Sequence, residues 1–252
     1  MFLGYGDIPE IASNKFAAQC LIAGGVWGDY WLKLGKMLKA KTVAWLGTDT
    51  SDTRDRNERT KGLMKAAGIE TVYEDYIQAD VQDLSSYITK IKYLAPDILC
   101  ADFSSEQYMT LGKQIAELGG LGKTKLLAMT QAATAGSKTK GFEGQYVLVA
   151  WMPGMTSPEA VKYEQDWKTV NGGVPNPNHI YYYVVLWTAI HAIEAVGNDT
   201  DLVKIAEVVR SGNLEFDTPI GHAHFTTDGH SGLGLTATIV KGGQLIPVEL
   251  PQ

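Results

Sequence analysis

The fold is decided in the stretch KTVAWLGTDTSDTRDRNERTKGLMKAAGIETVYEDYI, residues Lys41–Ile77, and in the pattern that continues from it to Trp151. Short apolar runs bounded by polar residues, Gly or Pro favour strands that are buried on both faces. Such runs stand at Thr42–Leu46, Thr71–Tyr76, Ile98–Ala101, Leu126–Met129 and Tyr146–Ala150. Between the early runs, apolar residues recur every three or four positions, which is typical of helices. The alternation predicts an α/β fold whose parallel sheet carries helices on both faces.

Local end signals place further elements on either side of this stretch. Ser104 with Gln107 fits a capping box, and Ser157 before Pro158 is a strong helix start. Asp80 is a candidate cap for the helix that follows it. Further helices are predicted over Trp27–Leu38 and His179–Val196 and from Asp199 or Thr200 to Ser211, and strands over Ala223–Phe225, Leu235–Val240 and Leu245–Val248.

Composition excludes several classes of function. The chain has 252 residues, 28 acidic and 22 basic, and a formal net charge of -6. A mildly acidic chain without a Lys/Arg cluster is a poor candidate for binding nucleic acid or an anionic membrane. The first residues have neither a basic segment nor a sustained apolar one, so we predict no signal peptide in this sequence. The two cysteines, Cys20 and Cys100, are expected to be small buried hydrophobes.

Three motifs suggest chemistry that their context does not support. GGLGKT at Gly119–Thr124 resembles part of a phosphate-binding loop, but a helix precedes it and a strand follows, so we reject nucleotide binding. The histidines His222, His224 and His230 with Asp228 lack a metal-ligand spacing, and we predict no metal site. No nucleophile–base pair or paired carboxylates argue for catalysis, so we predict no catalytic residues and no cofactor.

Polar and aromatic residues follow successive strands of the predicted sheet. In sheets of this kind, ligands bind beyond the carboxyl ends of the strands. A mixture of hydroxyls, amides, a carboxylate and aromatic faces suits a small polar or zwitterionic ligand. The predicted ligand-binding residues are Thr50, Ser51, Asp52, Asp102, Phe103, Ser104, Thr130, Gln131 and Trp151.

Several segments, in order, resemble one known family. They are KTVAWLGTDTSDT (Lys41–Thr53), KAAGIETVYEDYI (Lys65–Ile77), YLAPDILCADFSSEQYMTLGKQIAELG (Tyr93–Gly119), GFEGQYVLVAWMP (Gly141–Pro153), the region Tyr163–Gly197, and the tail Pro219–Val248. Together they resemble type I periplasmic binding proteins, most closely the branched-chain amino acid (Leu/Ile/Val) binding family of ABC importers. The order and spacing of many weak signals carry this resemblance.

The resemblance implies two α/β lobes that close around a small-molecule ligand, and delivery of that ligand to a membrane permease. It implies a periplasmic or cell-surface location and no enzymatic activity. Residues 1–40 would be a remnant of the first lobe, 41–155 the second lobe, 156–215 helices largely returning to the first lobe, and 216–252 the terminal strands and hinge region. The early units of the first lobe have no counterpart here, so we expect a partial chain with an incomplete first lobe. An exposed apolar surface and self-association through that lobe are therefore expected.

Two departures from the family concern the ligand, and one is that Ser51-Asp52-Thr53 replaces the Tyr-Gly common after the first strand. Relatives that bind aliphatic amino acids place an acid after the fourth strand, whereas this chain has Thr130-Gln131 there. Either Asp102 or Asp52 supplies the missing charge, or the ligand is not an amino acid. With much of the first lobe absent, we expect amino acids and small aromatic acids to bind weakly or not at all.

Two other functions remain open. A cytoplasmic ligand sensor of the same fold would be favoured by a full gene without an export signal. An α/β enzyme that uses the strand-end loops is less consistent with the missing nucleophile, base and metal sets.

Overall fold

The computed structural model describes residues 2–4, 13–20, 22, 24–134, 136–197 and 200–251. The chain forms two compact units. We call residues 27–149 with 236–252 the sheet unit, and residues 1–26 with 150–235 the helical unit. The chain passes between the units at residues 26/27, 149/150 and 235/236.

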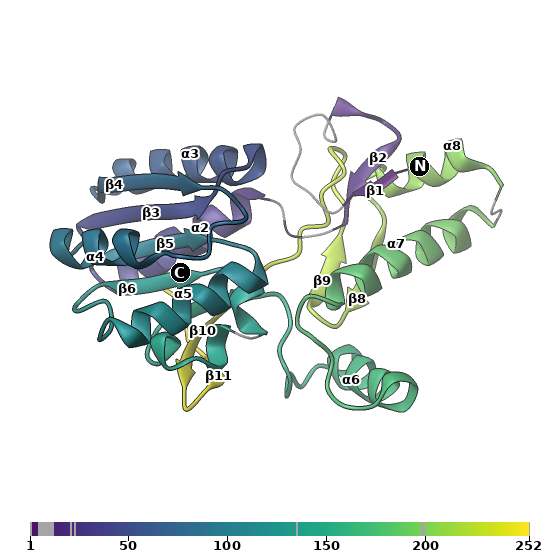
Figure 1. Cartoon of the computed structure of the whole chain (residues 1–252). Helices are drawn as coiled ribbons and strands as arrows, with labels where there is room; N and C mark the ends of the chain where they lie inside the picture. The colour runs from purple at the N-terminus through teal and green to yellow at the C-terminus, as the bar shows by residue number, and fades with distance from the viewer. Residues whose placement is uncertain are drawn as a thin grey trace. The chain divides into compact units, whose positions relative to one another are not determined.

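The sheet unit is built on one seven-stranded sheet with the order β11-β10-β7-β6-β5-β3-β4 (Figure 1). From β4 to β7 all neighbours are parallel, whereas β10 pairs antiparallel with β7 and with β11. The predicted parallel sheet is therefore confirmed, with an antiparallel edge added. The strands are β3 (Thr42–Thr48), β4 (Glu70–Ile77), β5 (Ile98–Asp102), β6 (Lys125–Ala128), β7 (Tyr146–Val149), β10 (Thr236–Lys241) and β11 (Gln244–Pro247).

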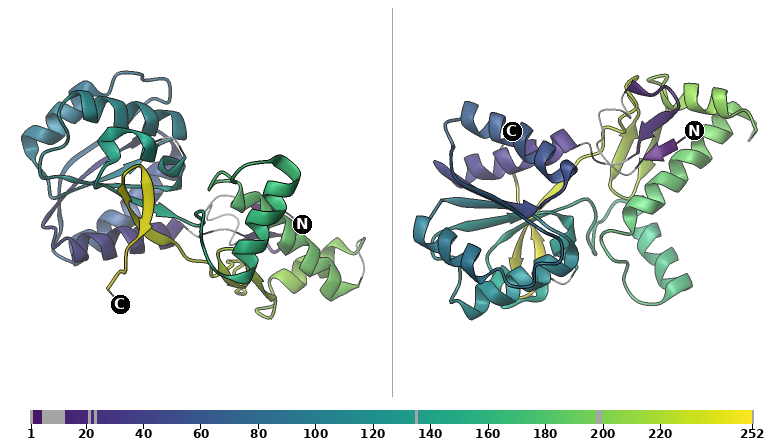
Figure 2. Two further views of the ribbon diagram at one scale, coloured as in Figure 1. Left: turned by 90° about the horizontal axis from the view of Figure 1, so that it is seen from below. Right: turned by 45° about the horizontal axis from the view of Figure 1, so that its top comes forward.

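Helices cover both faces of this sheet, as the sequence predicts (Figures 1 and 2). The chain leaves β3 for β4 through α3, returns to β5 through α4, and continues to β6 through α5. The chain moves along the sheet in one direction from β3 to β4 and in the opposite direction from β4 to β5 and β6. Because these crossovers are right-handed, this reversal places α3 on one face and α4 and α5 on the other. The reversal makes the carboxyl ends of β3 and β5 the switch point of the sheet. The helices are α2 (Gly24–Met37), α3 (Ser51–Ala66), α4 (Ser85–Leu94) and α5 (Ser105–Glu117).

In the described part of the chain, the helical unit carries two small sheets and the helices α6, α7 and α8. Two short strands pair in parallel, and a second pair forms an antiparallel hairpin. The sequence predicts a strand over Ala223–Phe225, close to the second strand of that hairpin, and predicts no strand where the first one lies. The elements are β1 (Phe2–Gly4), β2 (Ala17–Gln19), α6 (Pro158–Asn171), α7 (Ile180–Val196), α8 (Leu202–Val209), β8 (Glu215–Thr218) and β9 (Gly221–His224).

The unit boundaries differ in three places from the expected segments 1–40, 41–155, 156–215 and 216–252, one being that residues 150–155 lie in the helical unit. Most of α2 belongs to the sheet unit, where the fully buried Trp31 meets Trp45 edge-on with ring centroids 6.0 Å apart. The strands β10 and β11 also belong to that unit, because they continue its sheet beyond β7. Which unit corresponds to which lobe of the related proteins stays a prediction.

The ends of the helices test the local predictions. Ser104 and Ser157 cap α5 and α6 as predicted, each side-chain oxygen accepting a backbone N–H bond. Asp80 does not cap α4, which starts at Ser85 after Leu84. The cap of α8 is Asp201, one residue after Thr200; the other predicted start, residue 199, lies outside the described residues.

Both cysteines are buried and free, as predicted. The helix α7 leaves Tyr182 and Leu186 exposed, and α8 leaves Leu202 and Val203 exposed. The apolar exposure that we expected around α7 is therefore present. Among the described helices, none combines the length and apolar character that crossing a membrane requires.

Candidate functional site

The switch point of the sheet brings two helix starts together. Gly47 of β3 pairs in parallel register with Asp102 of β5, so α3 and α5 begin beside each other. The α3 N-cap is Thr50, whose Oγ1 accepts from the Thr53 N–H at 3.1 Å. The α5 N-cap is Ser104, whose Oγ accepts from the Gln107 N–H at 3.2 Å. The remaining first-turn N–H groups of both helices have no partner within their helix, which makes this edge a place for polar atoms of a ligand.

A buried arginine organises the same edge. Arg56, one turn into α3, is 8% exposed, and its guanidinium donates hydrogen bonds to the carboxylates of Asp102 and Asp52. Its Nη1 also lies 3.7 Å from the sulfur of Met129, at the end of β6. A charge can be held this far from water only where opposite charges compensate it. Arg56 therefore ties the ends of β5 and β6 to α3.

The two acids around Arg56 differ in how far they reach solvent. The Asp102 side chain is 10% exposed, and burial raises the pKa of its carboxyl against the opposing effect of the Arg56 guanidinium. The Asp52 side chain is 51% exposed. Burial works to lower the pKa of Arg56, but the charges of Asp102 and Asp52 outweigh it, so the guanidinium stays charged. Asp102 is thus not a free carboxylate for a ligand, whereas Asp52 has a solvent-facing side.

The predicted aromatic residue of this edge is part of the core. Phe103 is 3% exposed and meets Tyr108 edge-on, with ring centroids 5.7 Å apart. The Tyr108 hydroxyl donates to the Ala101 carbonyl and accepts from the Met129 N–H at 2.9 Å. Burial raises the pKa of Tyr108 well above its ordinary value, so the hydroxyl keeps its proton. Phe103 therefore supports the edge from behind.

Two predicted residues follow β6. Thr130 is fully buried, and its hydroxyl donates to the Leu148 carbonyl at 3.0 Å. That hydroxyl holds β7 in place, and a role of Thr130 in ligand binding stays a prediction. Gln131 is half-buried, and its Oε1 is buried without a hydrogen-bond partner in the described part of the chain.

Trp151 belongs to the helical unit, unlike the other predicted residues. Its side chain is fully buried and meets Tyr163 of α6 edge-on, with ring centroids 5.2 Å apart. It therefore presents no exposed aromatic face. Of the nine predicted residues, the structure brings eight to one edge of the sheet unit, and the exposed ones are Thr50, Ser51, Asp52 and Ser104.

Sequence reasoning missed two residues of this edge. Arg56 carries a usable signal, because it stands four positions after Asp52 on a helix, where opposite charges meet. The buried Gln107 was predicted only as the capping-box partner of Ser104, but its side chain bonds other residues. Its Oε1 accepts from Thr48 Oγ1 at 2.6 Å and its Nε2 donates to the Gln78 carbonyl at 3.3 Å, so it links the ends of β3 and β4.

The histidines considered for a metal lie elsewhere. His222 and His224 sit on β9, and their Nδ1 atoms lie 2.8 Å from Asp217 Oδ1 and 3.3 Å from Glu215 Oε2 on β8. Within the described ranges, no group of three or more His, Cys, Asp and Glu side chains is arranged to hold a metal ion.

Known structures share this architecture. A leucine-binding protein from Thermotoga maritima aligns over 94% of this chain and 68% of its own, with a TM-score of 0.81 and 20% identity. An ABC transporter solute-binding protein from R. palustris, in complex with benzoate, aligns over 93% of this chain and 65% of its own, with a TM-score of 0.82 and 16% identity. Another from R. palustris, in complex with 4-hydroxybenzoate, aligns over 92% and 66%, with a TM-score of 0.80 and 18% identity.

These values describe a shared fold, and the chain spans about two thirds of the length of these proteins. No curated protein matches the sequence significantly. A family model described as periplasmic binding protein matches residues 23–244. The chain therefore belongs to the periplasmic binding protein family, the solute-binding proteins of ABC transporters, and has the type I fold of that family.

Proposed function

We propose that this chain is the solute-binding component of an ABC importer and acts in the periplasm or at the cell surface. Its ligand is a small polar organic molecule, an amino acid or a related compound, which it passes to a membrane permease. Family membership and the leucine-binding and benzoate-bound neighbours support this function. In this proposal, the ligand is recognised at the edge of the sheet where β3 and β5 end.

The arrangement of charges at that edge supports a zwitterionic ligand. The carboxylates of Asp102 and Asp52 and the guanidinium of Arg56 together leave one net negative charge. Asp52 is the acid of this group whose side chain reaches solvent. An ammonium group would pair with Asp52. The first N–H groups of α3 and α5, with the exposed hydroxyls of Ser51 and Ser104, would receive a carboxylate. The arrangement around Arg56 is the single observation that carries this proposal.

A chemical-shift titration of the full chain tests it. Leucine should shift the backbone amides of residues 51–53 and 104–106, even where the affinity is only millimolar. Asp52→Asn should weaken leucine binding about three- to tenfold, since a half-exposed charged hydrogen bond is worth about 1 kcal/mol. Benzoate has no ammonium, so its affinity at these amides should not fall in the variant.

Asp55→Asn is the matched control, because it removes an exposed acid from the same helix. It should leave the affinity for leucine unchanged. If leucine shifts other amides of the folded protein but not those of residues 51–53 and 104–106, the proposed site is refuted.

Self-association through the helical unit is part of the same proposal. Tyr182 and Leu186 of α7 are 69% and 60% exposed, and α8 adds Leu202 and Val203. Large exposed apolar side chains mark contact surfaces. Sedimentation velocity should show a concentration-dependent dimer, and Leu186→Lys should shift it to monomer; a monomer at all concentrations would contradict this.

A further inference from the structure

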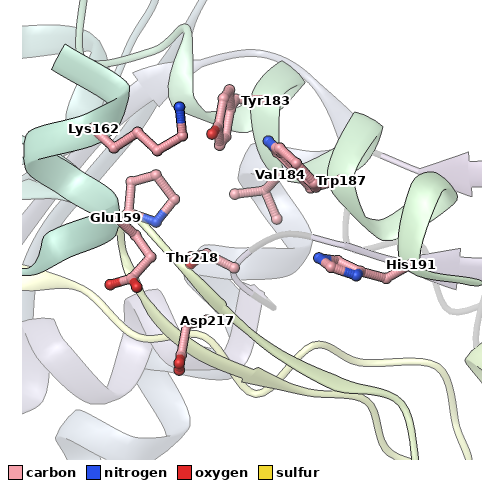
Figure 3. Close-up of a pocket in the computed structure, with 9 residues that line it drawn as sticks. Glu159, Lys162, Tyr183, Val184, Trp187, His191, Asp217 and Thr218 are labelled. Carbon is pink, nitrogen blue, oxygen red and sulfur yellow. The ribbon is translucent and has the colours of Figure 1, made fainter. Parts of the chain in front are cut away.

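A cavity of about 190 Å³ lies entirely within the helical unit (Figure 3). It opens between α6, α7 and β8, and it includes none of the residues predicted to bind the transported ligand. Its lining residues are Glu159, Lys162, Tyr183, Val184, Trp187, His191, Asp217, Thr218 and Pro219.

One wall of the cavity is a row of rings on α7. Tyr183, Trp187 and His191 follow at four-residue steps, which places them on one face of the helix. The Tyr183 and Trp187 centroids are 5.9 Å apart, and Trp187 and His191 stack at 5.3 Å with an interplanar angle of 29°. His191 in turn packs on Phe216 of β8, with ring centroids 4.5 Å apart. These contacts pack the rings against one another, so the wall offers flat apolar surfaces to a ligand.

Three polar groups that line the cavity can donate hydrogen bonds. In Figure 3 the Lys162 amine, the Tyr183 hydroxyl and the Trp187 indole nitrogen lie toward one side of it, whereas the carboxylates of Glu159 and Asp217 point away from these three groups. A donor-rich site with a cation favours an anion, and carboxylate oxygens accept such bonds well.

Of the acids near these donors, Asp166 is a weak partner and Asp217 is engaged elsewhere. The Lys162 Nζ atom lies 2.7 Å from Asp166 Oδ2, but both side chains are more than half exposed. Exposed ion pairs between neighbours on a helix are weak. Asp217 bonds His222 at 2.8 Å on the outer face of the hairpin. The Lys162 amine can therefore exchange its partner for a ligand carboxylate at little cost.

We propose that this cavity binds the carboxylate of a small acid with an aromatic or apolar body. The body would lie against Trp187 and Tyr183 over Val184, and the carboxylate would reach the Lys162 amine. This goes beyond the proposed transport function, because it is a second site in a different unit.

The test uses benzoate as the probe and the Trp187 indole N–H cross-peak as a local readout, assigned with Trp187→Phe. Benzoate should shift this cross-peak saturably at up to about 10 mM, the range expected for a ligand of this size. Benzamide and benzylamine keep the ring without the negative charge, and each should bind about tenfold more weakly, as loss of a charge-assisted bond implies.

Two lysine variants of α6 separate a specific contact from general charge. Lys162→Gln should weaken benzoate binding about fivefold, since a partly exposed ion pair is lost. Lys168→Gln, on the same helix but outside the cavity, should leave it unchanged. An equal effect of both variants, tighter binding of benzylamine, or a cross-peak that does not respond would overturn the proposal.

The same titration keeps the two sites apart. The Trp187 cross-peak reports on this cavity, and the amides of residues 51–53 report on the switch point of the sheet unit. A benzoate response of the Trp187 cross-peak supports this cavity whatever the amides of residues 51–53 do, and the leucine titration of those amides tests the switch point separately. Asp52→Asn should leave the Trp187 response to benzoate unchanged.

Discussion

The guanidinium of Arg56 donates to the carboxylate of Asp102, and both side chains are only 10% exposed. The two residues stand 46 positions apart in the sequence, on α3 and at the end of β5. Their pairing joins the helix to the sheet at the point where the strand order reverses. It also decides which acid of this edge remains available, because Asp102 is committed while Asp52 still faces solvent.

Removing Arg56 should be strongly destabilising. Arg56→Met leaves Asp102 buried without its counter-charge, which costs about 3–5 kcal/mol. Urea unfolding followed by circular dichroism measures this as a lower free energy of unfolding. Adding Asp102→Leu to Arg56→Met should restore much of the loss, because an apolar pair can replace a buried ion pair.

Arg54→Ala is the matched control on the same helix. Arg54 is half exposed and pairs with Asp49 at 2.7 Å. Its loss should lower the free energy of unfolding far less than the loss of Arg56, as for other exposed pairs. Equal losses for the Arg54 and Arg56 variants would contradict the structural role assigned to Arg56.

The parts of the fold that local signals determine could be predicted from sequence. Continuous apolar runs such as Thr42–Leu46 need only burial on both faces to become strands, and Ser104 and Ser157 cap their helices through bonds three residues away. The start of α4 follows a different rule. The Leu84 N–H donates to the Gln114 side chain at 2.7 Å, so a residue of α5 sets that start in place of Asp80.

The candidate site was predictable only in position. The rule that polar residues after parallel strands share an edge locates Thr50 and Ser104 correctly. Burial within that edge depends on contacts between distant residues, such as the Thr130 hydroxyl with the Leu148 carbonyl. Trp151 belongs to the helical unit because the chain passes between the units just before it, at residues 149/150. No local sequence pattern marks that point.

Thr130→Val should reduce stability without affecting ligand binding. The change keeps the shape of the side chain but leaves the buried Leu148 carbonyl without this donor, which costs about 1–2 kcal/mol. The free energy of unfolding in urea measures the loss, and the leucine titration of the amides of residues 51–53 measures binding. Lost binding with unchanged stability would show instead that Thr130 contacts the ligand.

Asp97 should contribute stability that is lost in acid. Its Oδ2 accepts from the N–H groups of Lys41 and Thr42 at 2.8 and 3.0 Å, at the start of β3. The Lys41 N–H is the main cause that holds the pKa of Asp97 below its ordinary value of 3.8. Because the folded pKa is the lower one, this contribution is complete above the unfolded value and disappears as the pH falls through the folded value.

Asp97→Asn should therefore lower the free energy of unfolding at pH 7 and reduce its dependence on pH below about 4. Urea unfolding across that pH range is the measurement. Asp55→Asn removes an exposed acid from α3 and controls for the loss of one surface charge. An Asp97→Asn variant with the pH dependence of the parent protein would show that Asp97 is not the group that titrates.

Two glycines of the sheet unit should respond to alanine in opposite directions. A Cβ on Gly141 would lie 2.1 Å from the Gly112 carbonyl oxygen of α5, a backbone atom that cannot move aside without shifting the helix. A Cβ on Gly62, in the exposed part of α3, would meet no atom within 4 Å. Gly141→Ala should cost about 3 kcal/mol by overpacking, whereas Gly62→Ala should stabilise the protein by about 0.5–1 kcal/mol. Thermal and urea unfolding of both variants measure the difference; if Gly141→Ala is neutral, the close contact between α5 and the loop before β7 does not exist in solution.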